Sequence, residues 1–330
     1  MTSAAASVKA ALKQTYLRIK SAAIVERNHD LGQTVFLAGG ARSGTTWLSD
    51  LINHDNAYRY MFEPFGKRQL GEFWYGSYLR PDDADPSLRA LAQDVLSGRM
   101  RDPWVDQFNR RLLVQRRLVK EVRANLWIKW LRVQFPEIPT IFLIRHPIPT
   151  VRSRFKRYFD AKDKAAIDVD PQGRTRDYKH YLLGQPALVA DHIAPFAREI
   201  ESAVDVYDQR LFTWAVQNFV PLRQLASGDA HVVFYEHLVM DPAGEMQRLF
   251  AFLNRTAGDA PLRNVWKPSA MSRFKEVPDP LKLVNGWVDK VPAADVSRAG
   301  EILGLFGLDK IYSADPMPVS GGLARFRAGL

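Results

Sequence analysis

The chain has 330 residues, 46% hydrophobic and 25% charged, and this composition excludes a disordered or fibrous protein. It contains no cysteine, which excludes disulfides, a thiol nucleophile and thiolate metal sites, and fits a reducing, cytoplasmic compartment. The net charge of +10 indicates a polyanionic or phosphorylated ligand. No stretch approaches the roughly 20 apolar residues that a membrane-spanning helix needs.

Residues 1–32 are predicted to form an N-terminal amphipathic helix and its connection to the domain. Val8, Leu12, Tyr16 and Ile19 recur at helical spacing among several basic residues. Two interpretations stay open. The apolar residues pack against the rest of the protein, or they make a weak contact with a membrane surface.

Strands and helices alternate along the remainder of the chain. Short apolar runs predict strands at 34–38, 118–122, 140–144 and 231–235. Helical periodicity predicts helices at 45–53, 126–135, 149–160, 211–225, 242–253 and 293–305. This order favours one α/β domain over residues 33–312, P-loop-like, with a mainly parallel sheet flanked by helices on both faces. Its ligand site is expected at the carboxyl ends of the strands.

Three further segments complete the predicted organisation. Residues 65–115 are expected to hold loops and short helices, and residues 161–200 are expected to form a charged, irregular surface insertion. Residues 313–330 are expected to form a loose tail.

A glycine-rich loop follows the first predicted strand of the domain. Its sequence, Gly39-Gly-Ala-Arg-Ser-Gly-Thr-Thr46, lies between a strand and a helix, where backbone amides and the helix dipole favour an anion. The spacing of Gly39 and Gly44 matches a nucleoside triphosphatase loop, but Thr45 occupies the lysine position. Arg42 is the nearby cation. The loop is therefore predicted to hold an anionic group without a metal.

A second anion site is predicted where the strand 140–144 ends. Arg145 follows that strand, and Ser153 comes eight residues later on the next predicted helix. An arginine and a serine placed in this way can bind a phosphate. Two such sites together require a ligand with two separated anionic groups.

These motifs resemble those of the sulfotransferases that use PAPS, 3′-phosphoadenosine 5′-phosphosulfate, as donor. Arg42-Ser-Gly-Thr-Thr-Trp47 resembles the 5′-phosphosulfate loop, and Leu143-Ile-Arg-His-Pro147 with Ser153 resembles the 3′-phosphate motif. Segments from Val233 to Pro242 and from Val284 to Tyr312 also resemble family segments. The resemblance implies PAPS as cofactor, no metal, and donor contacts from Arg42, Ser43, Gly44, Thr45, Thr46, Trp47, Arg145 and Ser153.

The catalytic residues implied by the resemblance are Glu63, Arg42 and Lys120. Lys120 matches a family lysine, but Val122 stands where the cytosolic small-molecule branch has its histidine base. The carbohydrate and tyrosylprotein branches share the Arg-Ser-Gly loop and have a glutamate about twenty residues later, a position that Glu63 fits. We expect Pro64 to keep Glu63 extended and nearby aromatic rings to raise its pKa, as suits a general base. His54 and Asp55 are the next candidates.

The predicted activity is transfer of a sulfuryl group to a hydroxyl or amine of an acceptor, with a glycan as one candidate. Residues 65–115 and 155–210 are interpreted as the segments that shape the acceptor pocket. A metal-dependent P-loop kinase and a noncatalytic nucleotide- or polyanion-binding protein are the alternatives. No nucleic-acid-binding module is recognisable, so nucleic acid is not an expected partner. Nine basic residues against three acids in 101–132 suggest either an anionic acceptor or the field around the donor.

Overall fold

The computed structural model describes residues 2–66, 76–154, 178–256, 261–265, 267 and 279–329. Its central sheet has the strand order β3-β5-β2-β6-β7. These strands are β2 (Thr34–Gly39), β3 (Tyr58–Phe62), β5 (Arg116–Glu121), β6 (Thr140–Ile144) and β7 (His231–Phe234). All neighbouring strands in the sheet run parallel. A separate parallel pair is formed by β1 (Val25–Glu26) and β4 (Leu113–Val114).

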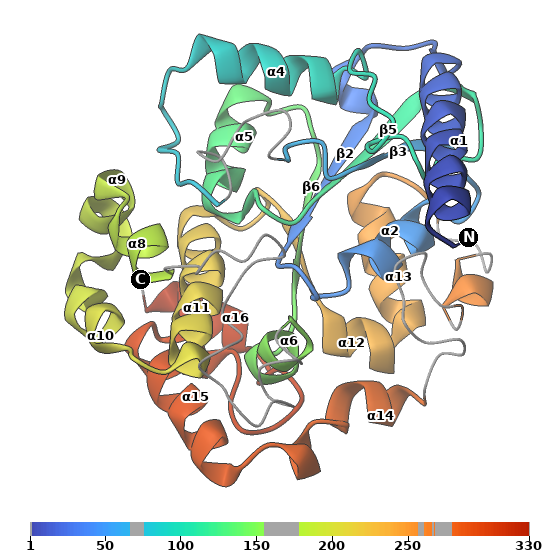
Figure 1. The fold of residues 1–330 in the computed structure, drawn as a ribbon. Helices are drawn as coiled ribbons and strands as arrows, with labels where there is room; N and C mark the ends of the chain where they lie inside the picture. The colour runs from blue at the N-terminus through green and yellow to red at the C-terminus, as the bar shows by residue number, and fades with distance from the viewer. Residues whose placement is uncertain are drawn as a thin grey trace.

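Helices cover both faces of the sheet and bury two hydrophobic clusters (Figure 1). Successive residues of β2 alternate between them: Phe36 and Ala38 belong to one, Val35 and Leu37 to the other. The second cluster includes α2 (Thr45–Ile52), α12 (Tyr235–Met240), α13 (Pro242–Phe252) and α14 (Pro280–Asn285). The first includes α4 (Pro86–Leu96), α5 (Ile128–Gln134), α6 (Pro147–Arg154), α11 (Val206–Gln224), α15 (Ala293–Leu305) and α16 (Gly322–Ala328). The predicted fold class is confirmed.

Local sequence signals explain several helix starts. Asp85 caps α4 by accepting hydrogen bonds from the backbone amides of Ser87 and Leu88, and Pro86 occupies the first turn. Asp241 and Pro242 begin α13 in the same way. These residues satisfy or remove backbone donors that a helix start otherwise leaves unpaired.

The structure corrects the sequence analysis at three places and leaves one prediction partly untested. The edge strand β3 was missed, because its buried residues 58–62 do not alternate in polarity. Residues 178–202 are helical, with α8 (Tyr178–Leu183), α9 (Pro186–Leu188), a π-helical turn (Val189–Ile193) and α10 (Ala197–Ser202), where an irregular segment was predicted. The tail is not loose, since α16 buries Phe326. The helix predicted over 149–160 is described only as far as residue 154; the rest lies outside the described residues.

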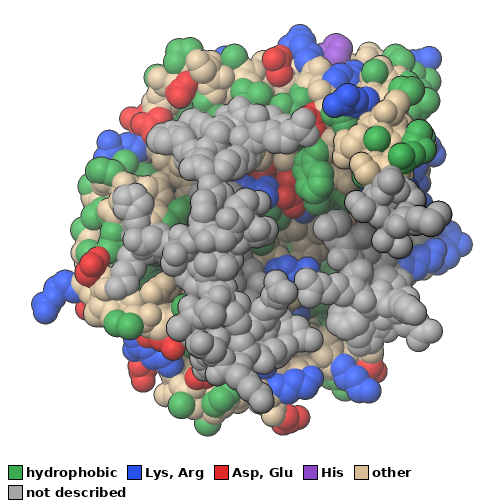
Figure 2. All heavy atoms as spheres, in the orientation of Figure 1, with side chains coloured by type: hydrophobic (Ala, Val, Ile, Leu, Met, Phe, Trp, Pro, Cys, Tyr) green, Lys and Arg blue, Asp and Glu red, His purple; other side chains and the backbone are tan. Residues whose placement is uncertain are grey.

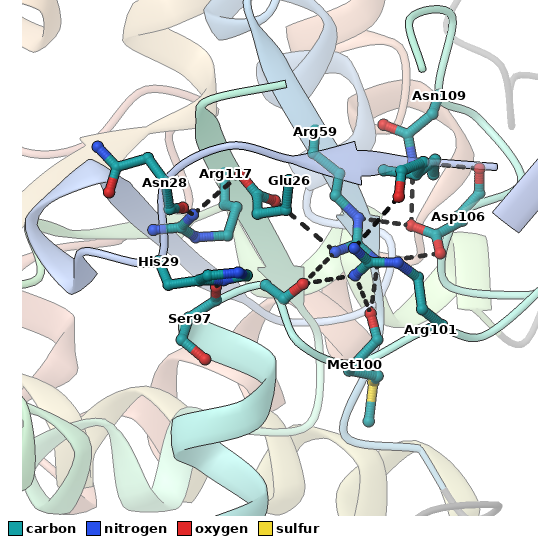
Figure 3. A network of polar contacts seen from close by, with 12 residues as sticks. Glu26, Asn28, His29, Arg59, Ser97, Met100, Arg101, Asp106, Asn109 and Arg117 are labelled. Carbon is teal, nitrogen blue, oxygen red and sulfur yellow. Dashed lines mark hydrogen bonds and ion pairs between the residues drawn. The ribbon is translucent and has the colours of Figure 1, made fainter. Parts of the chain in front are cut away.

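A buried network of charges lies at the amino ends of the strands, opposite the expected ligand site (Figure 3). Arg59 donates hydrogen bonds to both carboxylate oxygens of Asp106, at 2.8 and 3.0 Å. Arg117 lies 3.1 Å from Glu26 and donates to Thr34 and to the carbonyls of Asn28 and Asp30. Burial raises the pKa of Glu26, and the neighbouring arginines oppose that shift. The network joins the N-terminal segment to β3 and β5.

The N-terminal helix α1 (Thr2–Ala22) stands at the outer edge of the molecule (Figure 1). Its apolar residues Val8, Leu12, Tyr16 and Ile19 are exposed, so the interpretation that they pack against the protein is wrong. Of the described helices, none has the length and apolar character needed to cross a membrane.

Candidate functional site

The carboxyl ends of four neighbouring strands bring the predicted site residues to one edge of the sheet. Glu63 follows β3, and Lys120 lies near the end of β5. The glycine-rich loop follows β2, and Arg145 follows β6. Because β2 is central, its loop lies between the side that carries Glu63 and Lys120 and the side that carries Arg145. In Figure 2, side chains of Lys or Arg and of Asp or Glu are visible near the middle of the view, set back from the surrounding surface.

The loop requires glycine at Gly39 and Gly44 for steric reasons. A Cβ atom on Gly39 would lie 2.7 Å from the carbonyl oxygen of Leu143. Gly44 has a φ of 103°, and a Cβ there would lie 2.6 Å from the ring of Tyr235. The close approach to β6 and Tyr235 sets the start of α2, whose first amides have no partner earlier in the helix. This gives a cradle suited to an anion.

The hydroxyls of the loop differ in their surroundings. Ser43 is buried and donates a 2.6 Å hydrogen bond to the carbonyl of Gly40, which stabilises the turn. Thr45 is also buried, whereas Thr46 is half-buried. Trp47 donates to the carbonyl of Val265 and packs edge-on against Tyr235, so it takes part in the structure of this face.

Arg42, Arg145 and Ser153 come together across the loop. The Nε of Arg42 donates a 3.0 Å hydrogen bond to the hydroxyl of Ser153, and Arg145 donates to the carbonyl of Arg42 at 3.2 Å. The guanidinium of Arg145 lies 4.1 Å above the ring centre of Tyr235. Its buried Nε has no hydrogen-bond partner among the described residues. An unpaired donor beside a second arginine and a hydroxyl is the arrangement that a phosphate oxygen would complete.

Buried residues behind Arg145 fix the end of β6. Glu236 accepts hydrogen bonds from the backbone amide of His146 and from the hydroxyl of Tyr312, at 2.8 and 2.9 Å. His146 stacks against Trp287, with ring centres 4.8 Å apart. Burial lowers the pKa of His146 to about 4 and raises the pKa of Glu236. Sequence reasoning missed Glu236 and His146, although both lie inside the quoted motifs.

The carboxylate of Glu63 is held by two cations. Its Oε1 lies 2.6 Å from the Nζ of Lys120, and its Oε2 accepts a 2.8 Å hydrogen bond from Arg123. Lys120 is buried and lies 4.2 Å from the ring centre of Phe62. Sequence reasoning missed Arg123; a basic residue directly after a strand that carries Lys120 was the available signal.

The backbone and pKa of Glu63 both differ from expectation. Its φ is +49°, which is left-handed rather than extended, although its amide still donates to the carbonyl of Lys120. Burial alone would raise the pKa of Glu63, but Lys120 and Arg123 together hold it below its usual value. The carboxylate is therefore ionised at neutral pH. The prediction of a raised pKa was wrong because it considered the aromatic rings without the two cations.

Backbone strain marks the two predicted catalytic loops. Four non-glycine residues of the described part have positive φ: Arg42, Asn56, Glu63 and Asn254. Asparagine adopts this region more readily than other residues, whereas arginine and glutamate seldom do. Strained residues of this kind cluster at functional sites.

A small cavity adjoins the loop between α6 and α11. It is lined by Gly40, Ala41, Thr150, Val151, Arg210, Thr213, Trp214, Gln217 and Asn218. Arg210 is buried, so the cavity combines a fixed positive charge with hydroxyl and amide groups. It lies within reach of a ligand bound at the loop.

Other sequence candidates lie elsewhere. His54 and Asp55 follow the far end of α2; Asp55 pairs with Arg255 there, and neither side chain is placed at the loop.

Several of the basic residues in 101–132 support the fold. Arg117 is in the buried network, Arg132 donates hydrogen bonds to backbone carbonyls, and Lys129 pairs with Asp229. Lys120 and Arg123 are the two that meet Glu63.

The fold and this arrangement are those of a P-loop-like α/β protein with an anion cradle after its central strand. The sequence model of the sulfotransferase family matches residues 34–259. That match spans well over half of the chain, so the chain belongs to the sulfotransferase family, and the protein is a sulfotransferase. This membership favours sulfuryl transfer over the kinase and noncatalytic alternatives.

Among solved structures, three sulfotransferase-related chains illustrate the similarity. The sulfotransferase domain of the Synechococcus PCC 7002 olefin synthase is 17% identical, with a TM-score of 0.42 over 83% of this chain and 94% of that one. A mouse sulfotransferase complexed with PAP is 14% identical, with a TM-score of 0.40 over 84% of both chains. Retinol dehydratase, in complex with androsterone and PAP, is 15% identical, with a TM-score of 0.41 over 83% of this chain and 80% of that one. No curated protein sequence matches the chain.

Proposed function

We propose that the protein transfers the sulfuryl group of PAPS to a hydroxyl or amine of an acceptor. The observation that carries the proposal is the joint position of Arg42, Arg145 and Ser153 beside the glycine loop, with the Nε of Arg145 buried and unpaired among the described residues. Arg145 and Ser153 are assigned to the 3′-phosphate. The loop amides, Ser43, Gly44, Thr45, Thr46 and Trp47 are assigned to the phosphosulfate end.

The chemistry follows from the charges at the strand ends. Glu63, ionised at neutral pH, accepts the acceptor's proton as the new bond from oxygen or nitrogen to sulfur forms. The bond from sulfur to the bridging oxygen breaks, and adenosine 3′,5′-bisphosphate, PAP, leaves with the electron pair. Lys120 and Arg42 stabilise the charge that develops on the bridging and leaving oxygens. The protein's own cations supply this stabilisation, so no metal is part of the proposal.

Lys120 and Arg123 also set the strength of the base. Both cations stabilise the charged carboxylate of Glu63, so they keep it ready to accept a proton but make it a weak base. An approaching acceptor that displaces one of these contacts would raise the basicity of Glu63. The pairing thus links acceptor binding to proton removal.

The Arg-Ser-Gly loop and Glu63 support membership of the carbohydrate and tyrosylprotein branch, with a glycan hydroxyl as the first acceptor to test. We assign one small polar group of the acceptor to the cavity beside Gly40 and Ala41, which is about the size of a water molecule. Its buried Arg210 suits a small anionic group, such as a carboxylate oxygen of the acceptor. A cytoplasmic location remains part of the proposal.

The direct test is formation of PAP from PAPS in the presence of excess chelator. Purified protein is incubated with a panel of neutral glycans, acidic glycans and phenols, and sulfated product is detected by mass spectrometry. Product that forms only with an acceptor, and in stoichiometry with PAP, is the expected result. Loss of activity on chelation, or binding of ATP with magnesium in preference to PAP, would contradict the proposal.

A further inference from the structure

An apolar stripe runs along the outer side of α1. Val8, Leu12, Tyr16 and Ile19, here called the α1 stripe, are between 60% and 66% exposed. Their spacing of four, four and three residues places them on one side of the helix over about 16 Å. Such a continuous row differs from the single exposed apolar residues that are common on protein surfaces.

The body of the protein holds α1 mainly through its last turns. Every side chain from residue 7 to residue 16 is exposed. Near the end of the helix, Lys20 donates to the carbonyl of Gln107, and the hydroxyl of buried Ser21 donates a 2.6 Å hydrogen bond to Asp106. A helix of this length gains most of its stability in proteins from packing of an apolar face. The exposed α1 stripe is therefore of the kind that binds another molecule or a membrane.

The positive charge of α1 indicates which binding partner suits the stripe. Lys9, Lys13, Arg18 and Lys20 give residues 1–25 a charge of +4 from side chains, because the first acidic residue is Glu26. With a rotation of 100° per residue along the helix, Lys9 and Lys13 lie on one side of the stripe and Arg18 lies on the other side. A second copy of α1 would bring four more positive charges to the contact, and these would repel the first four. An anionic bilayer has negatively charged headgroups that attract the helix and an apolar interior that can bury the stripe.

We propose that α1 binds the surface of anionic phospholipid membranes. The α1 stripe enters the boundary between headgroups and acyl chains, with the helix axis along the membrane plane. Lys9 and Lys13 place their aliphatic stems beside the stripe and their ammonium groups among the phosphates. This inference rests on α1 alone and does not depend on the proposed reaction.

Vesicle sedimentation with the full chain tests the proposal. Wild-type protein should bind vesicles of phosphatidylcholine with phosphatidylserine at least about tenfold more tightly than vesicles of phosphatidylcholine alone. The double substitution Leu12→Gln and Ile19→Gln, which changes no charge, should weaken binding at least about tenfold, since each residue contributes buried apolar area. Ala10→Gln places the same side chain on the opposite, exposed side of α1 and should leave binding within about twofold of wild type.

A further pair of variants separates charge from apolar contact. Lys9→Gln with Lys13→Gln should weaken binding to the anionic vesicles several-fold and leave binding to phosphatidylcholine unchanged. The proposal is overturned if wild-type protein does not bind the anionic vesicles, or if the Leu12→Gln and Ile19→Gln protein binds as well as wild type. A dimer in light scattering that this double variant abolishes, without vesicle binding by wild type, would assign the stripe to a second copy instead.

Discussion

The ammonium group of Lys120 lies 2.6 Å from the carboxylate of Glu63, and this pair joins the ends of β5 and β3. The pairing is possible because the two strands are neighbours in register, with Phe62 opposite Lys120. Arg123 binds the other oxygen of the same carboxylate. Burial lowers the pKa of Lys120, and Glu63 opposes that shift, so each partner keeps the other charged.

Replacing Glu63 removes the proposed base. Glu63→Gln should lower turnover about 10²-fold or more, because the amide cannot accept the acceptor's proton. The Kd for PAP should change little. Single-turnover measurements with a working acceptor provide the test, and the exposed Glu137→Gln is the matched control. Near-normal turnover when chemistry limits the rate would place the base elsewhere.

The pH dependence of the reaction follows from the lowered pKa of Glu63. A base works in its ionised form, so activity is retained above its pKa and lost as the pH falls through it. Lys120 and Arg123 hold the pKa of Glu63 below the usual value of 4.5. Protonation of Glu63 should therefore cause no loss of turnover as the pH falls from neutral to 4.5. An acidic limb near pH 6 in kcat/KM would show that the free enzyme holds this carboxyl in a different environment.

The assignment of Arg145 and Ser153 to the 3′-phosphate predicts a selective loss of affinity. Arg145→Ala should weaken PAP binding by about 1.5–3 kcal/mol, the usual range for a hydrogen bond to a charged group. Ser153→Ala should have a smaller effect in the same direction. Adenosine 5′-phosphate, which lacks the 3′-phosphate, is the reference ligand in calorimetry. An equal loss for both nucleotides would refute the assignment.

Arg210 offers a test of the acceptor cavity. Arg210→Gln keeps a polar side chain but removes the charge that lines the cavity. We expect a rise in KM for an acidic acceptor of about tenfold or more, because a charge-assisted contact is lost. The Kd for PAP should stay near that of wild type. Weaker PAP binding with an unchanged acceptor KM would assign the cavity to the donor.

The buried network at the amino ends predicts a contrast between adjacent arginines. Arg117→Leu removes the closer cation of buried Glu26 and should cost about 3–5 kcal/mol of unfolding free energy, as for a broken buried ion pair. Arg116→Leu makes the same change at an exposed position of β5 and should stay within about 0.5 kcal/mol. Denaturant unfolding measures both. Equal effects would show that the network does not carry the stability assigned to it.

Sequence by itself determined the features that depend on residues close together in the chain. The strand 140–144, the strand–loop–helix unit around Gly39 to Thr46, and the parallel α/β class follow from short apolar runs, glycine positions and helical periodicity. These signals are local, and buried parallel strands are apolar on both faces, so they stand out in the chain. The position of Arg145 after its strand could be predicted for the same reason.

Tertiary structure alone decided the environment of each charged group. Glu63 lies 57 residues from Lys120 in sequence, and Arg42 lies 111 residues from Ser153, yet each pair is in contact. Hydrophobic periodicity does not predict such contacts. They depend on the order of the strands in the sheet and on the long connections that bring distant residues together. The same holds for the pKa of Glu63, which depends on two cations from another strand end. It also holds for α1, whose stripe is exposed while Lys20 and Ser21 near its end contact the rest of the described protein.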